Sequence, residues 1–252
     1  MIKTARVIVF VFDELPALEE YLLGKWVEIA RGEISGKGIF TAALSGGGSP
    51  EGFYRRLSQV AGKTLWRKTH IFMVDERLVP PDSPDSNFRM MDETLLSRAP
   101  IPRENIHPVR TDGPPEICAE RYASELSDFF KPAEGCYPAF DLVLLGLGED
   151  GHTASLFPGT DALTEKRLAA AVPEVKRHNR VTLTYPVLNS AKNIFFLVTG
   201  EKKAEILERL VEKGANDPAL PASGINPKNG TLLFLADSRA AARLSPERYR
   251  KM

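Results

Sequence analysis

FDLVLLGLGEDGHTASLFPG, residues 140 to 159, joins an apolar run to a turn that is rich in glycine and acids. The uninterrupted apolar residues Leu142 to Leu145 are typical of a strand buried on both faces of a parallel sheet. The turn holds three glycines, two acids and one histidine: Gly146, Gly148, Glu149, Asp150, Gly151 and His152. Glycines let the backbone turn sharply and approach a ligand closely. The stretch therefore predicts a buried strand that delivers titratable groups to a ligand site.

Six further apolar stretches of strand length alternate with segments of helical spacing. We expect strands at residues 7–12, 38–44, 69–74, 180–185, 193–199 and 231–236, and helices at 16–31, after Pro50, near 85–87, and at 114–130 and 201–213. This alternation predicts an α/β fold with a mostly parallel sheet flanked by helices. A chain of 252 residues can form one large α/β domain or two small ones, and no convincing linker or internal repeat is seen in residues 1–252.

The composition is that of an ordinary globular protein. Thirty-three basic residues balance thirty-three acidic ones, which gives no reason to expect a nucleic acid or membrane partner. Cys118 and Cys136 are too few for a disulfide framework and lack the spacing of a zinc site. The first apolar run is too short for a signal peptide, and no run reaches the roughly 18 residues of a membrane span. We expect a cytoplasmic protein.

A second glycine-rich turn follows the strand expected at 38–44. Ser45, Gly46, Gly47 and Gly48 precede Pro50, which suits the first turn of a helix, with Ser49 as its cap. Backbone N–H groups at such a turn can bind an anion such as a phosphate, although a plain tight turn is an equally good interpretation. The lysine of a P-loop is absent, which speaks against nucleoside triphosphates.

Residues 146–151 formally match the GxGxxG pattern of dinucleotide-binding folds. Glu149 and Asp150 lie inside that pattern, where their charges would repel a pyrophosphate. His152 would also stand where small packing residues open the helix. We therefore do not interpret the pattern as a dinucleotide site.

Charged residues at the same predicted edge of the sheet are candidates for chemistry. Parallel strands bring ligands to their carboxyl ends, and this rule gathers Ser45 to Gly48, Asp75 to Arg77 and Gly146 to His152. His152 could act as a base, because imidazole is largely neutral near pH 7. Arg77 could bind a phosphate or carboxylate through two hydrogen bonds. Arg180 and Lys203 are further phosphate candidates, although each considered alone fits a surface charge better.

Taken together, these motifs resemble the 6-phosphogluconolactonase family. The resemblance rests on Leu44-Ser-Gly-Gly-Gly-Ser-Pro50, on Val74-Asp-Glu-Arg77 with Ser86-Asn-Phe88, and above all on Gly146-Leu-Gly-Glu-Asp-Gly-His-Thr-Ala-Ser-Leu-Phe-Pro158. Shorter matches at 180–184, 200–204 and 220–223 extend it over nearly the whole chain.

The resemblance implies a single domain over residues 1–252 with a three-layer Rossmann-like fold and no metal or cofactor. It also implies hydrolysis of 6-phosphogluconolactone in the pentose phosphate pathway. In this reading His152 activates water, and either Asp150 or Asp75 orients its ring. Backbone N–H groups of the glycine turns, Gly148 among them, or Arg77 stabilise the oxyanion. Ser45, Gly46, Gly47, Gly48, Arg180 and Lys203 hold the phosphate. We expect a monomer or weak homo-oligomer.

Two rival functions accompany this reading. Glucosamine-6-phosphate deaminases share the glycine turn and Asp150-Gly-His152, but their Asn-Glu-Pro motif supplies a glutamate where this chain has Phe157. A phenyl ring cannot transfer a proton, which disfavours isomerisation. A non-catalytic sugar-phosphate-binding regulator is the other rival, and the intact His152 motif argues against it.

Overall fold

The fold is built on an eight-stranded sheet in which all the strand pairs are parallel. The computed structural model describes residues 8–60, 62–213, 217 and 219–252. The strand order is β11-β1-β10-β9-β6-β2-β3-β5. The strands are β1 (Ile8–Phe12), β2 (Phe40–Leu44), β3 (Thr69–Met73), β5 (Ile106–His107), β6 (Leu142–Gly146), β9 (Asn193–Val198), β10 (Thr231–Asp237) and β11 (Arg250–Lys251). The predicted parallel sheet is confirmed; Val7, expected to start the first strand, lies outside the described residues.

The apolar run Leu142 to Leu145 lies in β6, at the centre of this sheet. β6 lies between β2 and β9, with Leu144 in register with Leu44 on one side and Phe195 on the other. Leu142 to Leu145 are at most 1% exposed, as expected for a strand covered on both faces. The buried core of the protein therefore supports the turn that carries His152.

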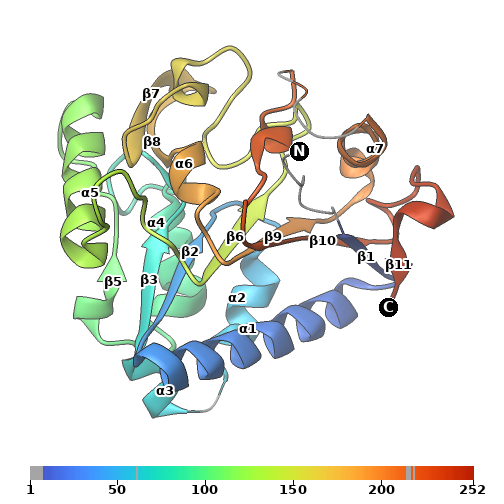
Figure 1. Ribbon diagram of the computed structural model, residues 1–252, viewed down its shortest axis with the longest axis horizontal. Coiled ribbons are helices and arrows are strands. Elements are labelled where there is room, and N and C mark those ends of the chain that lie inside the picture. The colour runs from blue at the N-terminus through green and yellow to red at the C-terminus, as the bar shows by residue number, and fades with distance from the viewer. Residues whose placement is uncertain (1–7, 61, 214–216, 218) are drawn as a thin grey trace.

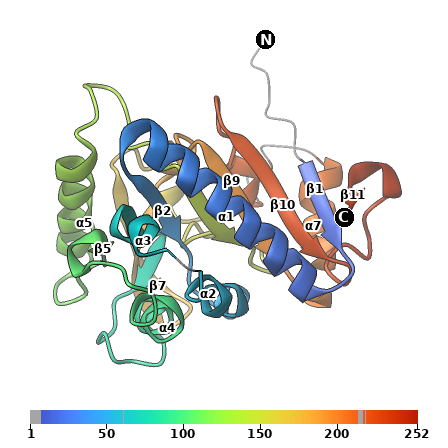
Figure 2. The ribbon, with the colours of Figure 1, turned by 90° about the horizontal axis from the view of Figure 1, so that it is seen from below.

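Helices cover both faces of the sheet, which confirms the three-layer α/β prediction. They are α1 (Leu15–Lys37), α2 (Glu51–Leu57), α3 (Lys63–Arg67), α4 (Asn87–Met91), α5 (Pro115–Phe130), α6 (Tyr185–Leu188) and α7 (Ala204–Lys213). Figure 1 shows α1, α2 and α3 on one side of the sheet and α6 and α7 on the other. In Figure 2, α1 crosses the strands diagonally. Among the described residues, no helix is long and apolar enough to cross a membrane.

A second, three-stranded antiparallel sheet was not predicted. It consists of β4 (Asp75–Arg77), β8 (His178–Leu183) and β7 (Ala169–Val175) in the order β4-β8-β7. The strand expected at 180–185 belongs to this sheet, and it ends before Tyr185, which begins α6. β7 contains a proline and a glutamate, so its sequence lacks the apolar run that marks a buried strand.

Two predicted element boundaries are wrong near the first helix. α1 continues to Lys37 and ends with Gly38 in a left-handed conformation, with φ 90°. Glycine is favoured at that position of a helix end, so the strand expected from residue 38 begins only at Phe40.

The predicted cap of α2 is also wrong. Pro50, rather than Ser49, occupies the N-cap position, and no side chain caps the helix. The hydroxyl of Ser49 instead accepts a hydrogen bond from Thr199, at 3.2 Å, which ties the glycine turn to the end of β9. The start predicted for α4 is confirmed, because the Ser86 hydroxyl accepts the backbone N–H of Arg89.

Candidate functional site

A pocket of about 220 Å³ lies at the carboxyl ends of the central strands. Its walls include residues from all three segments that the sequence placed at one edge of the sheet, and residues from other parts of the chain. They include Ser45, Gly46, Gly47, Gly48, Asp75, Arg77, Asn87, Gly148, His152, Arg180 and Lys203. Asp150 does not line this pocket but contacts the ring of His152, which does. The predicted site residues are thus brought together around one cavity.

His152 is held by the turn that follows β6. Its backbone carbonyl accepts the N–H of Gly148, at 2.8 Å, and its ring Nδ1 is hydrogen-bonded to Oδ1 of Asp150. A Cβ at residue 148 would overlap the imidazole and crowd the Asp150 carboxylate, so only glycine fits there. Because a carboxylate can only accept, Nδ1 carries the proton and Nε2 keeps its lone pair. This tautomer suits a general base.

The charges of this pair are set by burial and by a third residue. Burial lowers the pKa of His152 below its ordinary value of 6.5, and the neighbouring Asp150 carboxylate only partly opposes that effect. Burial would raise the pKa of Asp150, but hydrogen bonds from Lys176 and His152 outweigh it and hold the pKa well below 3.8. Near pH 7 the pair is therefore a neutral imidazole beside an ionised carboxylate.

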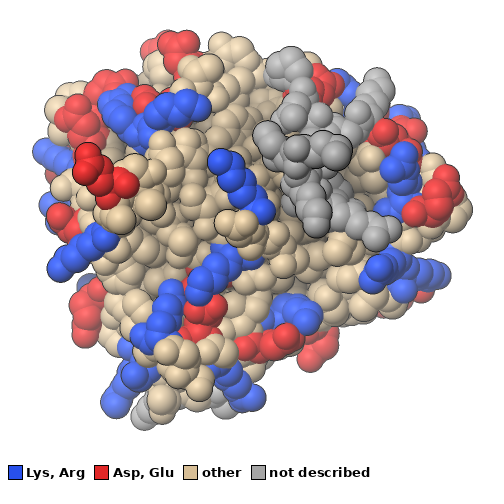
Figure 3. Space-filling model, viewed as in Figure 1, with Lys and Arg blue, Asp and Glu red and all other residues tan. Residues whose placement is uncertain are grey.

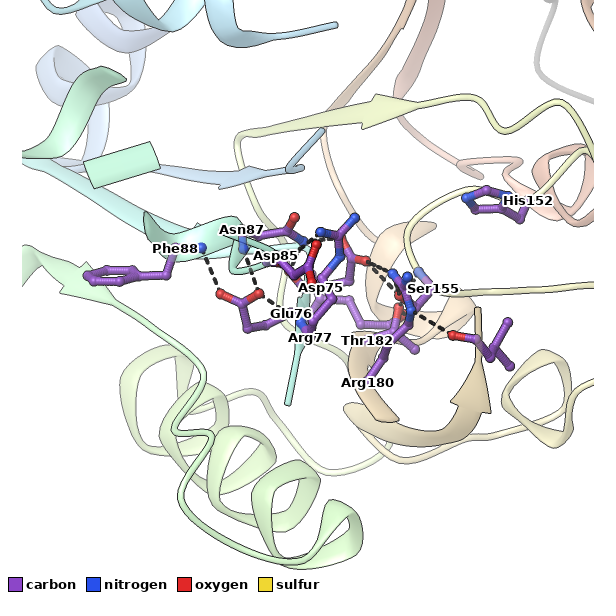
Figure 4. A network of polar contacts seen from close by, with 12 residues as sticks. Asp75, Glu76, Arg77, Asp85, Asn87, Phe88, His152, Ser155, Arg180 and Thr182 are labelled. Carbon is purple, nitrogen blue, oxygen red and sulfur yellow. Dashed lines mark hydrogen bonds and ion pairs between the residues drawn. The ribbon is translucent and has the colours of Figure 1, made fainter. Parts of the chain in front are cut away.

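Asp75, the other candidate for orienting the histidine, has different partners. Its Oδ2 accepts the Ser155 hydroxyl at 2.6 Å, and its Oδ1 lies 3.4 Å from the amide nitrogen of Asn87. Figure 4 shows Asp75 inside this network, with no dashed contact to His152. Of these two aspartates, Asp150 is the one hydrogen-bonded to the His152 ring.

Glu76 anchors the loop that brings Arg77 and Asn87 to the pocket. It is 1% exposed, and its carboxylate accepts the backbone N–H groups of Arg77, Asn87 and Phe88, each at 2.7 Å. The Ser86 hydroxyl donates a fourth bond at 3.2 Å. The buried Glu76 side chain thus accepts hydrogen bonds from backbone N–H groups at the start of α4 and holds this part of the pocket wall in place (Figure 4).

Basic side chains form part of the pocket wall. Arg77 of β4 lies directly opposite Arg180 of β8 in the antiparallel register, and Lys203 lines the pocket from the segment after β9. Two like charges side by side are unfavourable unless an anion lies between or near them. Arg180 is only 7% exposed and lies 3.8 Å from Asp75, which compensates part of this charge. The wall is thus suited to a negatively charged group.

Phe157 occupies the position where the deaminase motif has glutamate. Its ring stacks on His152, with 4.3 Å between centroids and 28° between planes. Arg180 also lies over this ring, with its guanidinium carbon 5.3 Å from the centroid. The His152 imidazole is thus flanked by an aromatic face rather than by a second acid.

On the face shown in Figure 3, Lys and Arg side chains are interspersed with Asp and Glu. Within the described ranges, no three His, Cys, Asp or Glu side chains are grouped so that they could hold a metal ion.

Sequence reasoning missed three residues that shape this site. Ser155 and Asn87 stood inside the quoted motifs, but their polar side chains carried no signal of a bond to Asp75. Lys176 lies in a segment without any motif, and only the fold brings its ammonium group to Asp150, at 2.8 Å.

Comparisons with known proteins agree with the resemblance seen in the sequence. The family model described as glucosamine-6-phosphate isomerases/6-phosphogluconolactonase matches residues 13–234. A 6-phosphogluconolactonase of Nostoc sp. is 44% identical over 213 residues, covering 84% of this chain and 88% of that protein. The structure of 6-phosphogluconolactonase from Trypanosoma brucei superposes with a TM-score of 0.82 at 30% identity, covering 96% of this chain and 100% of that one.

A monomeric glucosamine-6-phosphate deaminase has a similar backbone. It superposes with a TM-score of 0.80 over 94% of this chain and 100% of that chain. The two sequences are 21% identical, so this likeness concerns the fold alone.

Proposed function

Because this chain belongs to the glucosamine-6-phosphate isomerase/6-phosphogluconolactonase family, we propose that it hydrolyses 6-phosphogluconolactone to 6-phosphogluconate, a step of the pentose phosphate pathway. The observation that carries this proposal is the His152–Asp150 pair beside a pocket with cationic walls. A neutral imidazole whose Nδ1 is held by a carboxylate can take a proton from water through Nε2.

The proposed reaction needs only a base, an acid and oxyanion donors. His152 removes a proton from water as the water oxygen attacks the lactone carbonyl. The tetrahedral intermediate collapses, the bond to the ring oxygen breaks, and the imidazolium returns the proton to that oxygen. Asp150 orients the ring and stabilises its charged form. A positioned base contributes about 10² to 10⁴ in rate, and one oxyanion donor roughly 3 kcal/mol.

The phosphate of the substrate would bind to the basic wall of the pocket. We assign it to Arg180 and Lys203, together with backbone N–H groups of Ser45 to Gly48. Arg77, which lies opposite Arg180, is placed either to share the phosphate or to stabilise the oxyanion; backbone N–H groups of the glycine turns, including Gly148, could also serve the oxyanion. The buried hydroxyl oxygen of Ser45 has no hydrogen-bond partner among the described residues, which leaves it available to a ligand.

The deaminase alternative is less well supported. Ring opening and isomerisation need a second proton-transfer group beside the histidine, and Phe157 fills that position with a ring that stacks on His152. A direct assay separates the two activities. The protein should release acid from freshly generated 6-phosphogluconolactone well above the spontaneous rate. Release of ammonia from glucosamine 6-phosphate without lactone hydrolysis would refute the proposal.

We also propose that the chain forms one domain and acts in the cytoplasm as a monomer or weak homo-oligomer. Cys118 and Cys136 are both free thiols, which suits a reducing compartment.

A further inference from the structure

The hairpin formed by β7 and β8 lies next to the turn that carries Asp150 and His152, here called the catalytic turn. β7 and β8 are joined at residues 176–177, and three residues there have left-handed backbone angles without being glycine. They are Glu174 with φ 40°, Lys176 with φ 52° and Arg177 with φ 80°. Positive φ at both loop residues matches the tight turns that usually close two-residue hairpins, although Asn and Gly are more common there.

The hairpin makes two contacts with the catalytic turn through one side chain. The ammonium nitrogen of Lys176 lies 2.8 Å from Oδ2 of Asp150, while Oδ1 of the same carboxylate is bonded to the His152 ring. The same nitrogen lies 5.1 Å from the centroid of Phe157, whose ring stacks on His152. Lys176 thus touches both residues that flank the imidazole.

The ion pair itself contributes little to stability. The side chain of Lys176 is 53% exposed, and an exposed ion pair contributes less than about 1 kcal/mol to folding. The contact has a clearer effect on the orientation of Asp150, because the lysine fixes one carboxylate oxygen and leaves the other for His152.

We propose that Lys176 is a positioning residue that holds Asp150 against His152 and, through its own positive charge, keeps the imidazole unprotonated and ready to act as a base. This inference rests on the proposed function of His152. Three charged groups interact electrostatically with His152: Asp150 from the same turn, Asp75 from β4 and Lys176 from the hairpin. Lys203 interacts electrostatically with Asp150. Removing Lys176 subtracts one of the positive charges, which favours the imidazolium.

The test compares wild type with Lys176→Met, Lys176→Arg and a matched control, Lys25→Met. Lys25 is a lysine of α1 that also makes one ion pair, with Glu28 at 2.7 Å. One readout is the pH dependence of kcat/KM. The other is an NMR titration of the His152 ring in the free protein, assigned with a His152→Ala sample.

Lys176→Met should raise the midpoint of both curves by about half a pH unit, which lowers kcat/KM roughly threefold on the acidic side. It should also lower kcat severalfold at the plateau, because Asp150 is less well held. Lys176→Arg should restore the wild-type midpoint, and Lys25→Met should not move it.

Two results would overturn the inference. Unchanged midpoints together with an unchanged plateau kcat in Lys176→Met would show that the lysine neither acts on His152 nor holds Asp150. A higher KM with midpoints and plateau kcat unchanged would make Lys176 a substrate contact instead. A wild-type protein without lactonase activity would refute the proposed function, whereas the NMR titration of the free protein would still decide the effect of Lys176 on His152.

Discussion

Replacing Asp150 with asparagine tests the proposal that Asp150 stabilises the charged form of His152. The substitution keeps the shape of the side chain but removes the charge that stabilises the imidazolium. A unit charge about 4 Å away is worth about 4 kcal/mol at an effective dielectric of 20. The Asp150 side chain is 37% exposed, and solvent screening reduces this to about 3 kcal/mol. We therefore expect kcat to fall about 10²-fold.

The pH profile gives the sign of the effect. Without the carboxylate the imidazolium is less stable, so the pKa of His152 falls further and the acidic limb of kcat/KM moves to lower pH. This shift is opposite to the one expected for Lys176→Met. KM should stay close to that of the wild type, because Asp150 does not line the pocket.

The assay follows acid release from freshly generated lactone across pH, with the spontaneous rate subtracted. Glu149→Gln is the matched control, since it removes the adjacent acid, which is 61% exposed and has no hydrogen bond to His152. Its kcat should stay within about twofold of the wild type. A kcat for Asp150→Asn within threefold of the wild type, or an acidic limb that moves to higher pH, would refute the assigned role of Asp150.

Four further substitutions test the rest of the site and the fold. Glu76→Gln should raise KM and lower the free energy of unfolding by about 1–3 kcal/mol, because its amide cannot accept all four bonds that anchor the loop; denaturant unfolding and kinetics measure both. Asp141→Asn removes a fully buried carboxylate that lies 2.8 and 3.0 Å from two lysines, each of which is more than a third exposed. The free energy of unfolding should therefore fall by about 1–3 kcal/mol, because the lysines lose a charged hydrogen-bond acceptor but remain solvated. The pKa of Asp141 is lowered in the folded protein, so wild-type stability relative to this variant should be full above about pH 4 and shrink as pH falls further. Lys203→Ala and Arg180→Ala should chiefly raise KM, and an unchanged KM in both would remove them from the phosphate site.

The sequence was sufficient to predict the parallel sheet because its strands are marked by apolar runs. β2 and β6 are covered on both faces, so nearly every residue in them is apolar, and the glycine turns that follow them stand out. The rule that ligands bind at the carboxyl ends of parallel strands then brought three distant segments to one pocket.

The antiparallel sheet could not be predicted in the same way. β4 is only three charged residues long, and β7 contains Pro173 and Glu174. Neither has a periodic pattern. β4 pairs with β8, about 100 positions further along the chain, whereas β7 pairs with the adjacent β8. The choice between Asp75 and Asp150, and the contact of Lys176, depend on that pairing. Local sequence therefore left both undecided.

The most direct test of the account is the turnover of His152→Ala on 6-phosphogluconolactone. Its kcat should be at least about a hundredfold below the wild type, with a KM that shows that substrate still binds, because the base is lost while the basic wall of the pocket remains. Circular dichroism and thermal unfolding establish that the variant is folded. Near wild-type turnover by the folded variant would contradict the assignment of His152 as the base.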